Sequence, residues 1–368
     1  MKFSINREEL LEPLQLVSGV VERRQTLPVL SNLLCAVEDG RLTLTGTDQE
    51  VELSATTESI SEESIGEITV PARKLMDICR SLPGAADVQV QLEENRLGLQ
   101  SGRFKSHLAT LPAVDFPKVE IDTTSLRLNI SGNQLARLLE KTSFAMAQQD
   151  VRYFFNGLLM EIDGGGVRGV ATNGQRLAIS DLTTKTGIDG NNQFIVPRKG
   201  VIELARLIKD VDQEEIELQL TSNHLRVTKG TASLTTKLID GTYPDYNRAI
   251  PEAADKLVVI DRREFKDALS RIAILSNEMY RNVKLFLSQG VVQLNANNPM
   301  QEEAEESINV DYDGEDLEIG FNVGYLIDVL NILEGAKVEV ALSDSNSAAL
   351  LTDPEDESSR FVVSPMML

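Results

Sequence analysis

The chain has 368 residues, of which 42 % are hydrophobic, and this is enough to bury a substantial core in two or three domains. It contains no run of roughly 18 apolar residues that could span a bilayer, and its N-terminus lacks the apolar segment of an export signal, so we expect a cytoplasmic protein without a membrane partner. The formal net charge of -21 disfavours binding to a polyanion on the sum alone, because contacts to phosphate need Lys and Arg.

The first third of the chain contains two strand-helix units. An alternating strand at residues 2–5 precedes an expected helix at about 7–16, and a second strand at 68–70 precedes an expected helix at 72–82. Further alternating strands, separated by turn residues, follow each helix. We expect this first domain to span residues 1–121.

The same order of elements starts again twice, which predicts a second domain at residues 125–250 and a third at 256–368. The expected helices of these domains cover residues 134–140, 197–209, 262–272 and 323–333. Polar landmarks flank the apolar strands about 125 residues apart, namely Asn32, Asn156 and Asn282 before a strand and Thr47, Thr172 and Asn297 after one. The pattern predicts an α+β fold of three similar domains, each made of two strand-helix-strands units, with six helices on one face of antiparallel sheets.

Residues 193–209 show the repeated unit most clearly, as a short apolar strand, Pro197 and then an amphipathic helix. In this helix Lys199, Glu203 and Arg206 are spaced so that they share a polar stripe. The apolar face is expected to contain Val201, Ile202, Leu204, Ala205, Leu207 and Ile208.

The charge is distributed unevenly between the expected helices and the rest of the chain. The six helices carry about 14 basic and 10 acidic residues, whereas the remainder carries about 22 basic and 47 acidic residues. Basic helices in an otherwise acidic protein are suited to face a polyanion that the sheets repel. Solvated helix faces without a ligand remain the alternative.

Residues with the spacing of a catalytic or metal site are absent from the sequence. The two histidines, His107 and His224, lie in strand patterns without a Cys or carboxylate at ligand spacing, and no zinc-protease, nucleophile-elbow or phosphate-loop motif occurs. Cys35 and Cys79 follow apolar patterns and are expected to be buried thiols in a reducing compartment. We therefore expect no enzymatic activity, no catalytic residues, no metal and no cofactor.

Several short motifs, taken together and in order, resemble one family over essentially the whole chain. They are Met1-Lys2-Phe3, Thr26-Leu27-Pro28, Leu44-Thr45-Gly46-Thr47-Asp48, Val70-Pro71-Ala72-Arg73-Lys74, Asp150-Val151-Arg152-Tyr153, Val196-Pro197-Arg198-Lys199-Gly200, Tyr243-Pro244-Asp245-Tyr246 and Gly320-Phe321-Asn322-Val323. This set resembles the bacterial DNA polymerase III beta subunit family, the replication sliding clamps.

The resemblance implies a head-to-tail homodimer that closes as a ring, with helices lining the hole, antiparallel sheets outside and duplex DNA threaded through it. Such a ring confers processivity on the replicative polymerase and holds DNA topologically, so contacts to phosphate are weak and independent of sequence. It further implies a pocket for short linear motifs of the polymerase alpha subunit, the clamp loader delta subunit, other DNA polymerases and repair proteins. The alternative from another class is a peptide-binding oligomeric scaffold that does not encircle DNA.

The resemblance also implies functional positions in this sequence. The implied DNA-contacting residues are Arg24, Arg73, Gln149, Tyr153, Phe154, Arg198 and Lys199. The implied pocket residues are Arg152, Phe155, Thr172, Gly174, Arg176, Leu177, Pro244, Arg248, Ala249, Asn346, Val362, Pro365, Met366 and Leu368. In the implied dimer seam, basic Lys74, Arg96, Arg103 and Lys105 oppose acidic Glu302, Glu303, Glu305 and Glu306, and Leu108 packs against Ile274 and Leu275.

Some positions depart from the family pattern. Phe154 stands where a Tyr is common and lacks the hydroxyl that could donate to phosphate. Ser106 replaces an aromatic residue in the seam, while Asn346, Ala249 and Ser364 are smaller or more polar than expected in the pocket. The apolar tail at residues 364–368 is suited to an adaptable binding surface. The alternative is that this tail is a last edge strand that packs into the third domain.

Overall fold

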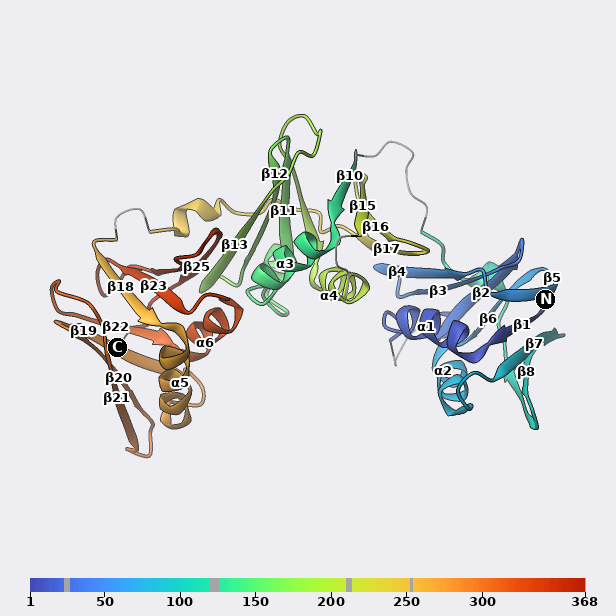
Figure 1. Ribbon diagram of the computed structural model, residues 1–368, viewed down its shortest axis with the longest axis horizontal. Helices are drawn as coiled ribbons and strands as arrows, with labels where there is room; N and C mark the ends of the chain where they lie inside the picture. Colours follow the sequence, from blue (N-terminus) through green and yellow to red (C-terminus); the bar gives the residue numbers. More distant parts are fainter. Residues whose placement is uncertain (23–26, 120–125, 210–213, 252–253, 368) are drawn as a thin grey trace. The chain divides into compact units, whose positions relative to one another are not determined.

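The computed structural model describes residues 1–22, 27–119, 126–209, 214–251 and 254–367 (Figure 1). These residues form two compact units, the first made of Met1–Asn133 with Lys199–Leu238 and the second of Gln134–Arg198 with Ile239–Leu368. The predicted middle domain contributes to both units, and the three predicted domain ranges stay predictions. Within the described ranges, no helix has both the length and the apolar character needed to cross a membrane.

Each α-helix follows directly after a strand, as the sequence predicts. Asn6, Asp261 and Asn322 begin three of the helices, and their side chains accept hydrogen bonds from backbone N–H groups of the first turn. The described residues contain six α-helices, which are α1 Arg7–Val17, α2 Ala72–Ser81, α3 Gly132–Ser143, α4 Arg198–Leu207, α5 Arg262–Ile272 and α6 Val323–Ile332. The predicted six helices are therefore confirmed, with α3 longer at both ends than its apolar pattern indicates.

The first unit contains two antiparallel sheets. The five-stranded sheet has the order β5-β1-β7-β8-β9, with β5 Ile60–Ser64, β1 Lys2–Asn6, β7 Asp87–Glu93, β8 Arg96–Ser101 and β9 Phe104–Ala109. The eight-stranded sheet has the order β10-β15-β16-β17-β4-β3-β2-β6, with β10 Leu126–Ser131, β15 Glu215–Leu220, β16 His224–Lys229, β17 Ala232–Lys237, β4 Val51–Thr57, β3 Arg41–Thr47, β2 Asn32–Glu38 and β6 Gly66–Pro71.

The second unit also contains two antiparallel sheets. Its eight-stranded sheet has the order β14-β11-β12-β13-β25-β24-β23-β18, with β14 Asn192–Pro197, β11 Gly157–Asp163, β12 Gly166–Thr172, β13 Arg176–Thr183, β25 Asp356–Val363, β24 Ala349–Asp353, β23 Lys337–Leu342 and β18 Lys256–Asp261. Its four-stranded sheet has the order β21-β20-β19-β22, with β21 Glu303–Asn309, β20 Val291–Asn297, β19 Asn282–Ser288 and β22 Leu317–Asn322.

Both eight-stranded sheets join halves that come from different predicted domains. In the first unit β17 pairs with β4, and in the second unit β25 pairs with β13. Each half is a run of four strands that ends at the join, and the halves of all three repeats share this order. By the same order β9 and β21 are the corresponding end strands, and each lies at the edge of its sheet.

Helices α1 and α2 pack side by side on the sheets of the first unit, and their apolar residues form one core with the inward faces of the strands (Figure 1). Cys35 and Cys79 belong to this core, and burial raises the pKa of each thiol to about 12. The expectation of two buried thiols is confirmed. In the second unit, helices α5 and α6 contact each other in the same way.

The polar and apolar faces of α4 differ from the prediction. Ile202 and Ala205 are exposed, and Glu203 is buried beside Arg206, with Nη1 to Oε2 at 3.4 Å. The buried stripe follows Val201, Leu204 and Ile208, whose spacing of three and four residues places the other two apolar side chains outside it. The expected polar stripe of this helix is therefore partly internal.

Candidate nucleic-acid and peptide interfaces

Several basic side chains of the helices bind the carbonyl ends of neighbouring helices. Arg7, at the start of α1, donates from Nε to Cys79 O at 3.0 Å at the end of α2. Arg262, at the start of α5, donates from Nη1 to Leu330 O at 3.2 Å near the end of α6. The last carbonyls of a helix lack intrahelical partners and carry partial negative charge, so these cations complete the helix ends. Both guanidinium groups are therefore partly neutralised by contacts within the protein.

Helix α3 binds α6 through two further cations. Lys141, whose side chain is only 1 % exposed, donates from Nζ to Ile332 O at 2.8 Å and lies 3.4 Å from Glu334 Oε1. Arg137 contacts Glu334 at 3.1 Å and Asp356 at 2.9 Å. Such partnered charges add little to the surface potential, so the basic excess counted over the helices overstates what could face a polyanion.

Lys199, an expected DNA contact, lies in a half-buried ion cluster of the first unit. Its Nζ is 2.6 Å from Glu22 Oε1, forms a second ion pair with Asp48 and donates to Val20 O at 3.3 Å. Burial opposes its charge, but the hydrogen bonds to these carboxylates outweigh burial and hold the pKa of Lys199 above its ordinary value. In the single chain the charge of this ammonium is therefore balanced by two carboxylates.

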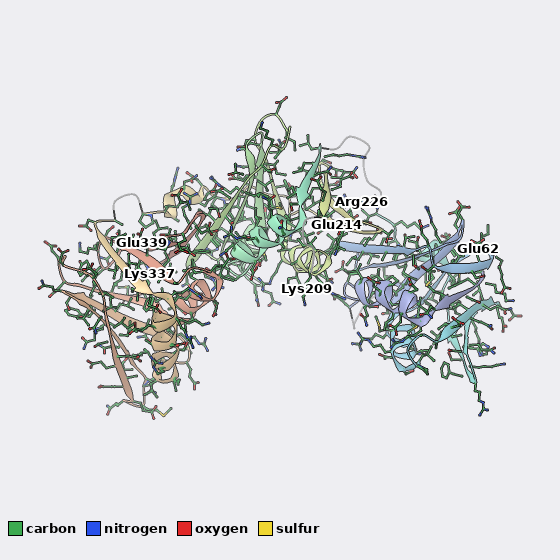
Figure 2. All side chains as sticks on the ribbon, viewed as in Figure 1. Glu62, Lys209, Glu214, Arg226, Lys337 and Glu339 are labelled. Atoms are coloured by element: carbon green, nitrogen blue, oxygen red, sulfur yellow. The ribbon has the colours of Figure 1, made fainter. Side chains whose placement is uncertain are left out.

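Other cations of the helices remain at the surface. Arg73 lies exposed on α2. Lys209 lies exposed just beyond the end of α4, as Figure 2 shows. Arg198 is half-buried and its Nη1 reaches Met146 O at 3.5 Å, while burial and then the nearby Arg176 lower the pKa of Arg198. Arg24 lies outside the described residues.

The loop before β11 brings the other expected DNA residues near the expected pocket. Gln149 has a left-handed backbone with φ of 55°, and the Tyr153 ring is 54 % exposed. Phe154, in contrast, is half-buried and packs edge-on against Phe155 with ring centroids 4.7 Å apart. Phe154 therefore belongs to an aromatic cluster that also includes Tyr243.

A hollow of about 650 Å³ in the second unit collects several predicted pocket residues, and its lining includes Phe144, Met146, Arg152, Gly174, Arg176 and Tyr325. Arg152 lies over the Phe155 ring at 4.6 Å and forms a bidentate pair with Asp150, with Nε to Oδ1 at 3.0 Å and Nη2 to Oδ2 at 2.8 Å. Hydrogen bonds from Arg152 lower the pKa of Asp150 to about 2.

Gly174 keeps this hollow open. Its φ of 87° favours glycine, and a Cβ added there would lie 2.8 Å from Arg152 Nη1. On the other side Arg176 donates to Phe144 O at 2.6 Å, pairs with Asp328 and lies 4.7 Å from the Tyr325 ring. The guanidinium groups are therefore held in place before a ligand arrives.

Two other predicted pocket residues, Leu177 and Val362, are buried in the apolar core of the same unit. Leu177 on β13 pairs with Val362 on β25, and both belong to a buried cluster that includes Tyr246. Thr172 donates its N–H to the Tyr243 hydroxyl at 3.1 Å. Six further predicted pocket residues lie on exposed or half-exposed segments, namely Pro244, Arg248, Ala249, Asn346, Pro365 and Met366.

The chain end is held against the third repeat, because Met366 donates its N–H to Gly320 O at 2.8 Å. This confirms the alternative of a tucked tail, which is compatible with a role in the pocket. Leu368 lies outside the described residues.

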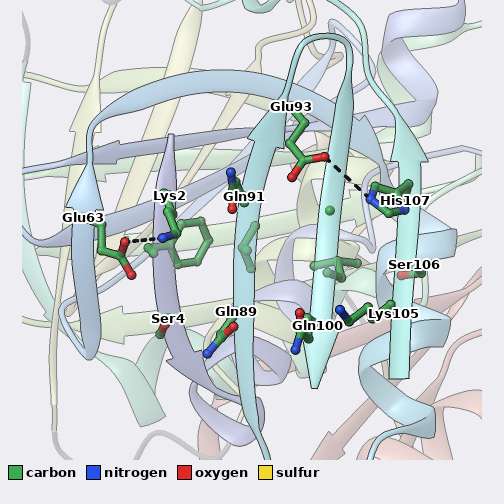
Figure 3. A pocket seen from close by; sticks show the side chains of 14 residues that line it. Lys2, Ser4, Glu63, Gln89, Gln91, Glu93, Gln100, Lys105, Ser106 and His107 are labelled. Atoms are coloured by element: carbon green, nitrogen blue, oxygen red, sulfur yellow. Dashed lines mark ion pairs between the residues drawn. The ribbon is translucent and has the colours of Figure 1, made fainter. Parts of the chain in front are cut away.

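The predicted seam residues lie on the two free end strands and the segments beside them. Figure 3 shows Lys105, Ser106 and His107 on β9, with His107 Nε2 3.8 Å from Glu93 Oε2. Lys74, Arg96 and Arg103 are exposed, and so is Ile274 at 77 %, whereas Leu275 is partly exposed. Leu108 is only 7 % exposed because it already packs in its own core, so it offers little area to a partner.

The acidic seam residues have internal contacts in the single chain. Arg271 holds Glu306 in a bidentate pair, and Asn298 donates to Glu302 at 2.6 Å. Gln293 donates to Glu305, and Glu303 lies exposed at the start of β21. A partner strand would have to share or displace these contacts.

Sequence patterns did not indicate two groups that the structure shows to be central. Lys141 lies just beyond the helix predicted at residues 134–140, and its side chain binds a partner helix about 190 residues away. Arg168 and Asp181 form an ion pair at 2.5 Å and lie opposite each other in the β12–β13 hairpin. The register of that hairpin, counted outward from its turn, could have revealed the second pair.

Each of the three repeats matches one domain of a known protein family. Residues 1–120, 129–245 and 247–367 match the N-terminal, central and C-terminal domains of the DNA polymerase III beta subunit. A Pseudomonas aeruginosa protein described as a beta sliding clamp is 53 % identical over 368 residues, covering 100 % of both chains. A beta sliding clamp of Escherichia coli is 45 % identical over the same length and coverage.

Solved structures agree with these matches. The crystal structure of the DNA polymerase III subunit beta from Pseudomonas aeruginosa has a TM-score of 0.97 and 53 % identity, with 100 % of both chains covered. A sliding clamp of the same organism bound to griselimycin has a TM-score of 0.96 and 52 % identity, with the same coverage. The chain therefore belongs to the DNA polymerase III beta subunit family, the beta sliding clamps.

Proposed function

We propose that two copies of this chain close head to tail into a ring that encircles duplex DNA and tethers the replicative DNA polymerase, without catalysing a reaction. The proposal includes the domain ranges 1–121, 125–250 and 256–368, a cytoplasmic location and no cofactor. The membership in the sliding-clamp family supports it, and so do the strands β9 and β21, each of which lies at the edge of its sheet.

The strand joins within the chain supply the register of the proposed seam. Where β17 meets β4, Leu234 lies opposite Leu53 and Thr235 opposite Glu52. Within the repeats, Ser106 of β9 corresponds to Leu234, and Ala304 of β21 corresponds to Leu53, because each holds the same place relative to its hairpin partner. Ser106 of one copy is therefore expected to lie opposite Ala304 of the next.

This register brings opposite charges together. Directly opposed residues of antiparallel strands share a face, so Lys105 would meet Glu305 and His107 would meet Glu303 on the outer face. The small residues Ser106 and Ala304 would meet on the inner face, toward the helices. A shift by one residue would bring Lys105 opposite Ala304 or Glu306 and would turn each charged side chain away from its partner.

The proposed DNA contacts are few and weak. We propose Arg73, Gln149, Tyr153 and Arg198 as contacts, with Arg24 added by family resemblance. Lys199 is proposed to act through its ion cluster rather than on phosphate, and Phe154 through the aromatic cluster of the pocket. Loose contacts suit a protein that holds DNA by topology, since each strong phosphate contact would slow sliding.

The peptide pocket is proposed to comprise the hollow around Arg152, Gly174 and Arg176 together with the strand join at which Leu177 lies opposite Val362. A relative was solved with griselimycin, which makes that compound a suitable probe for this surface. The proposed natural ligands are short motifs of the polymerase alpha subunit, the clamp loader delta subunit, other polymerases and repair proteins.

The test of the ring is retention on DNA after loading by the clamp loader with ATP. We expect the protein to remain on a nicked circle through a high-salt wash and to leave when the circle is cut once. Equal retention before and after the cut would contradict topological binding, and a mass of one chain in solution would contradict the dimer. A peptide-binding scaffold would bind griselimycin and show no retention on either DNA.

The register is tested by cross-linking. Ser106→Cys combined with Ala304→Cys is expected to give a covalent dimer on oxidation, because the native thiols Cys35 and Cys79 are buried. Ser106→Cys with Ser307→Cys, three residues further along β21, serves as the control and is expected to cross-link poorly. The reverse preference would refute the register.

A further inference from the structure

A polar network on the second unit links side chains of four strands, β11, β12, β13 and β25, to the segment that carries Tyr246. The Tyr246 hydroxyl donates to Glu161 Oε2 at 2.6 Å and accepts from Arg168 Nη1 at 3.3 Å. Arg168 also forms a bidentate pair with Asp181, with Nε to Oδ1 at 2.5 Å and Nη2 to Oδ2 at 3.2 Å. Arg360 contacts the same carboxylate at 3.3 Å.

The network lies beside the segment that borders the proposed peptide pocket. Tyr246 begins the short helix Tyr246–Ala249, and the proposed pocket residues Arg248 and Ala249 belong to that helix. At the start of the segment, Ile239 forms a bridge with Ile195, and the Tyr243 hydroxyl accepts from Thr172 N at 3.1 Å. The Tyr246 hydroxyl is thus a third attachment of this segment to the sheet, after Ile239 and Tyr243.

The first repeat offers an internal comparison. Its segment after the bridge between Thr69 and Leu111 also contains an Asp followed by an aromatic residue, Asp115-Phe116, although this pair lies two residues nearer the bridge than Asp245-Tyr246 does. Phe116 is buried in a small apolar cluster and has no hydroxyl. An aromatic ring alone is therefore sufficient to pack this segment on its sheet.

The polar partners of Tyr246 also differ from the residues at the same positions in the first repeat. Arg168 and Asp181 correspond to Thr43 and Thr56, which lie opposite each other on β3 and β4 and whose hydroxyls are 2.9 Å apart. The short side chains of a Thr pair can hydrogen-bond to each other across the two strands. The longer guanidinium of Arg168 also reaches the hydroxyl of Tyr246, on the segment that packs on the sheet. The charged network and the hydroxyl are found in the repeat that carries the proposed pocket.

We propose that Tyr246 is a positioning residue for the peptide pocket, with Glu161 and Arg168 holding its hydroxyl so that residues 243–249 stand ready for a ligand. This inference rests on the proposed function of the pocket. Tyr246 does not touch the ligand, and it acts by fixing Pro244, Arg248 and Ala249 before binding, which lowers the ordering cost of association.

The test compares Tyr246→Phe with Tyr312→Phe in the full-length dimer. Each change deletes one hydroxyl from a buried Tyr of the second unit, since Tyr312 donates to Glu315 O at 2.7 Å away from the pocket residues. We expect Tyr246→Phe to weaken griselimycin binding about 3- to 10-fold, mainly through faster dissociation, which corresponds to the net value of one hydrogen bond. Tyr312→Phe is expected to leave the affinity unchanged.

Two further measurements separate positioning from general destabilisation. Amide hydrogen exchange over residues 243–249 is expected to speed up in Tyr246→Phe alone, while the dimer mass and the melting temperature change no more than in Tyr312→Phe. Glu161→Gln keeps an acceptor for the hydroxyl without the charge, and it is expected to give an intermediate affinity.

The outcomes distinguish this inference from the proposed function. Equal griselimycin affinity for the wild type and Tyr246→Phe, or an equal loss in both Tyr variants, would overturn the positioning role and leave the pocket intact. Failure of the wild type to bind griselimycin would overturn the proposed pocket, and the positioning role with it.

Discussion

Lys141→Met replaces a buried ammonium by an apolar group of similar length, and we expect it to destabilise the second unit by about 2 kcal/mol. The ammonium makes a hydrogen bond of 2.8 Å to Ile332 O, and a bond to a charged donor is worth about 1.5–3 kcal/mol net. Met fills the space without a cavity, but it leaves the carbonyl at the end of α6 without this donor. Relief of the buried charge offsets part of the loss, which places the estimate in the middle of the range.

The assay is thermal unfolding followed by circular dichroism. For a unit of about 200 residues, a loss of about 2 kcal/mol corresponds to a fall of about 4–8 °C in the melting temperature of that unit. Lys185→Met, at an exposed position of the same unit, is the matched control and is expected to shift the temperature by less than about 1 °C. Equal shifts in the two variants would show that the contact of Lys141 with α6 contributes nothing to stability.

Three further changes test other parts of the structure. Gly174→Ala is expected to strain the backbone at φ of 87° by about 1 kcal/mol and to weaken griselimycin binding several-fold in a titration, and unchanged binding would show that the hollow tolerates a side chain there. Ser106→Leu is expected to tighten the dimer about 10-fold by filling the inner face of the seam, as measured by mass photometry on dilution, whereas a weaker dimer would mean that the site is already full. Burial alone would raise the pKa of Asp356, but hydrogen bonds from Ser358 and the charge of Arg137 hold this pKa below its ordinary value. The ionised carboxylate therefore stabilises the fold above pH about 4, and this stabilisation is lost as the pH falls below that. Arg137→Met should reduce this acid dependence of the melting temperature, and an identical pH profile of the variant and the wild type would contradict the assignment.

The sequence predicts the elements of this protein well because local periodicity determines them. The strand and helix of each repeat lie close to where the apolar pattern predicts them, and Asn6 and Asp261 cap two of these helices. The internal repeat then indicates which elements correspond, and the resemblance places the pocket residues. Leu177 and Val362, predicted for one pocket, do meet across a strand join.

Partners that are distant in the sequence could not be predicted in this way. The ion pairs of Lys199 and the burial of Lys141 depend on tertiary contacts that leave no periodic signal in the sequence. A count of charges treats every cation as exposed, so it assigned to the surface several side chains that complete helix ends inside the fold. The sequence pattern also wrongly placed Ile202 on the buried face of α4. An apolar side chain can lie next to the buried stripe of a helix and still be exposed to solvent.

The strand pairs β17–β4 and β25–β13 bear on where a ring of this kind would open. Both joins form within one chain, so their strands meet at an effective concentration in the millimolar range or above, whatever the amount of protein. A seam between β9 and β21 of separate copies would have the same strand geometry but would depend on the protein concentration. Because the internal joins are covalently connected, a ring of two copies would open at the β9–β21 seam. Dilution of the protein would separate this seam and leave the β17–β4 and β25–β13 pairs intact.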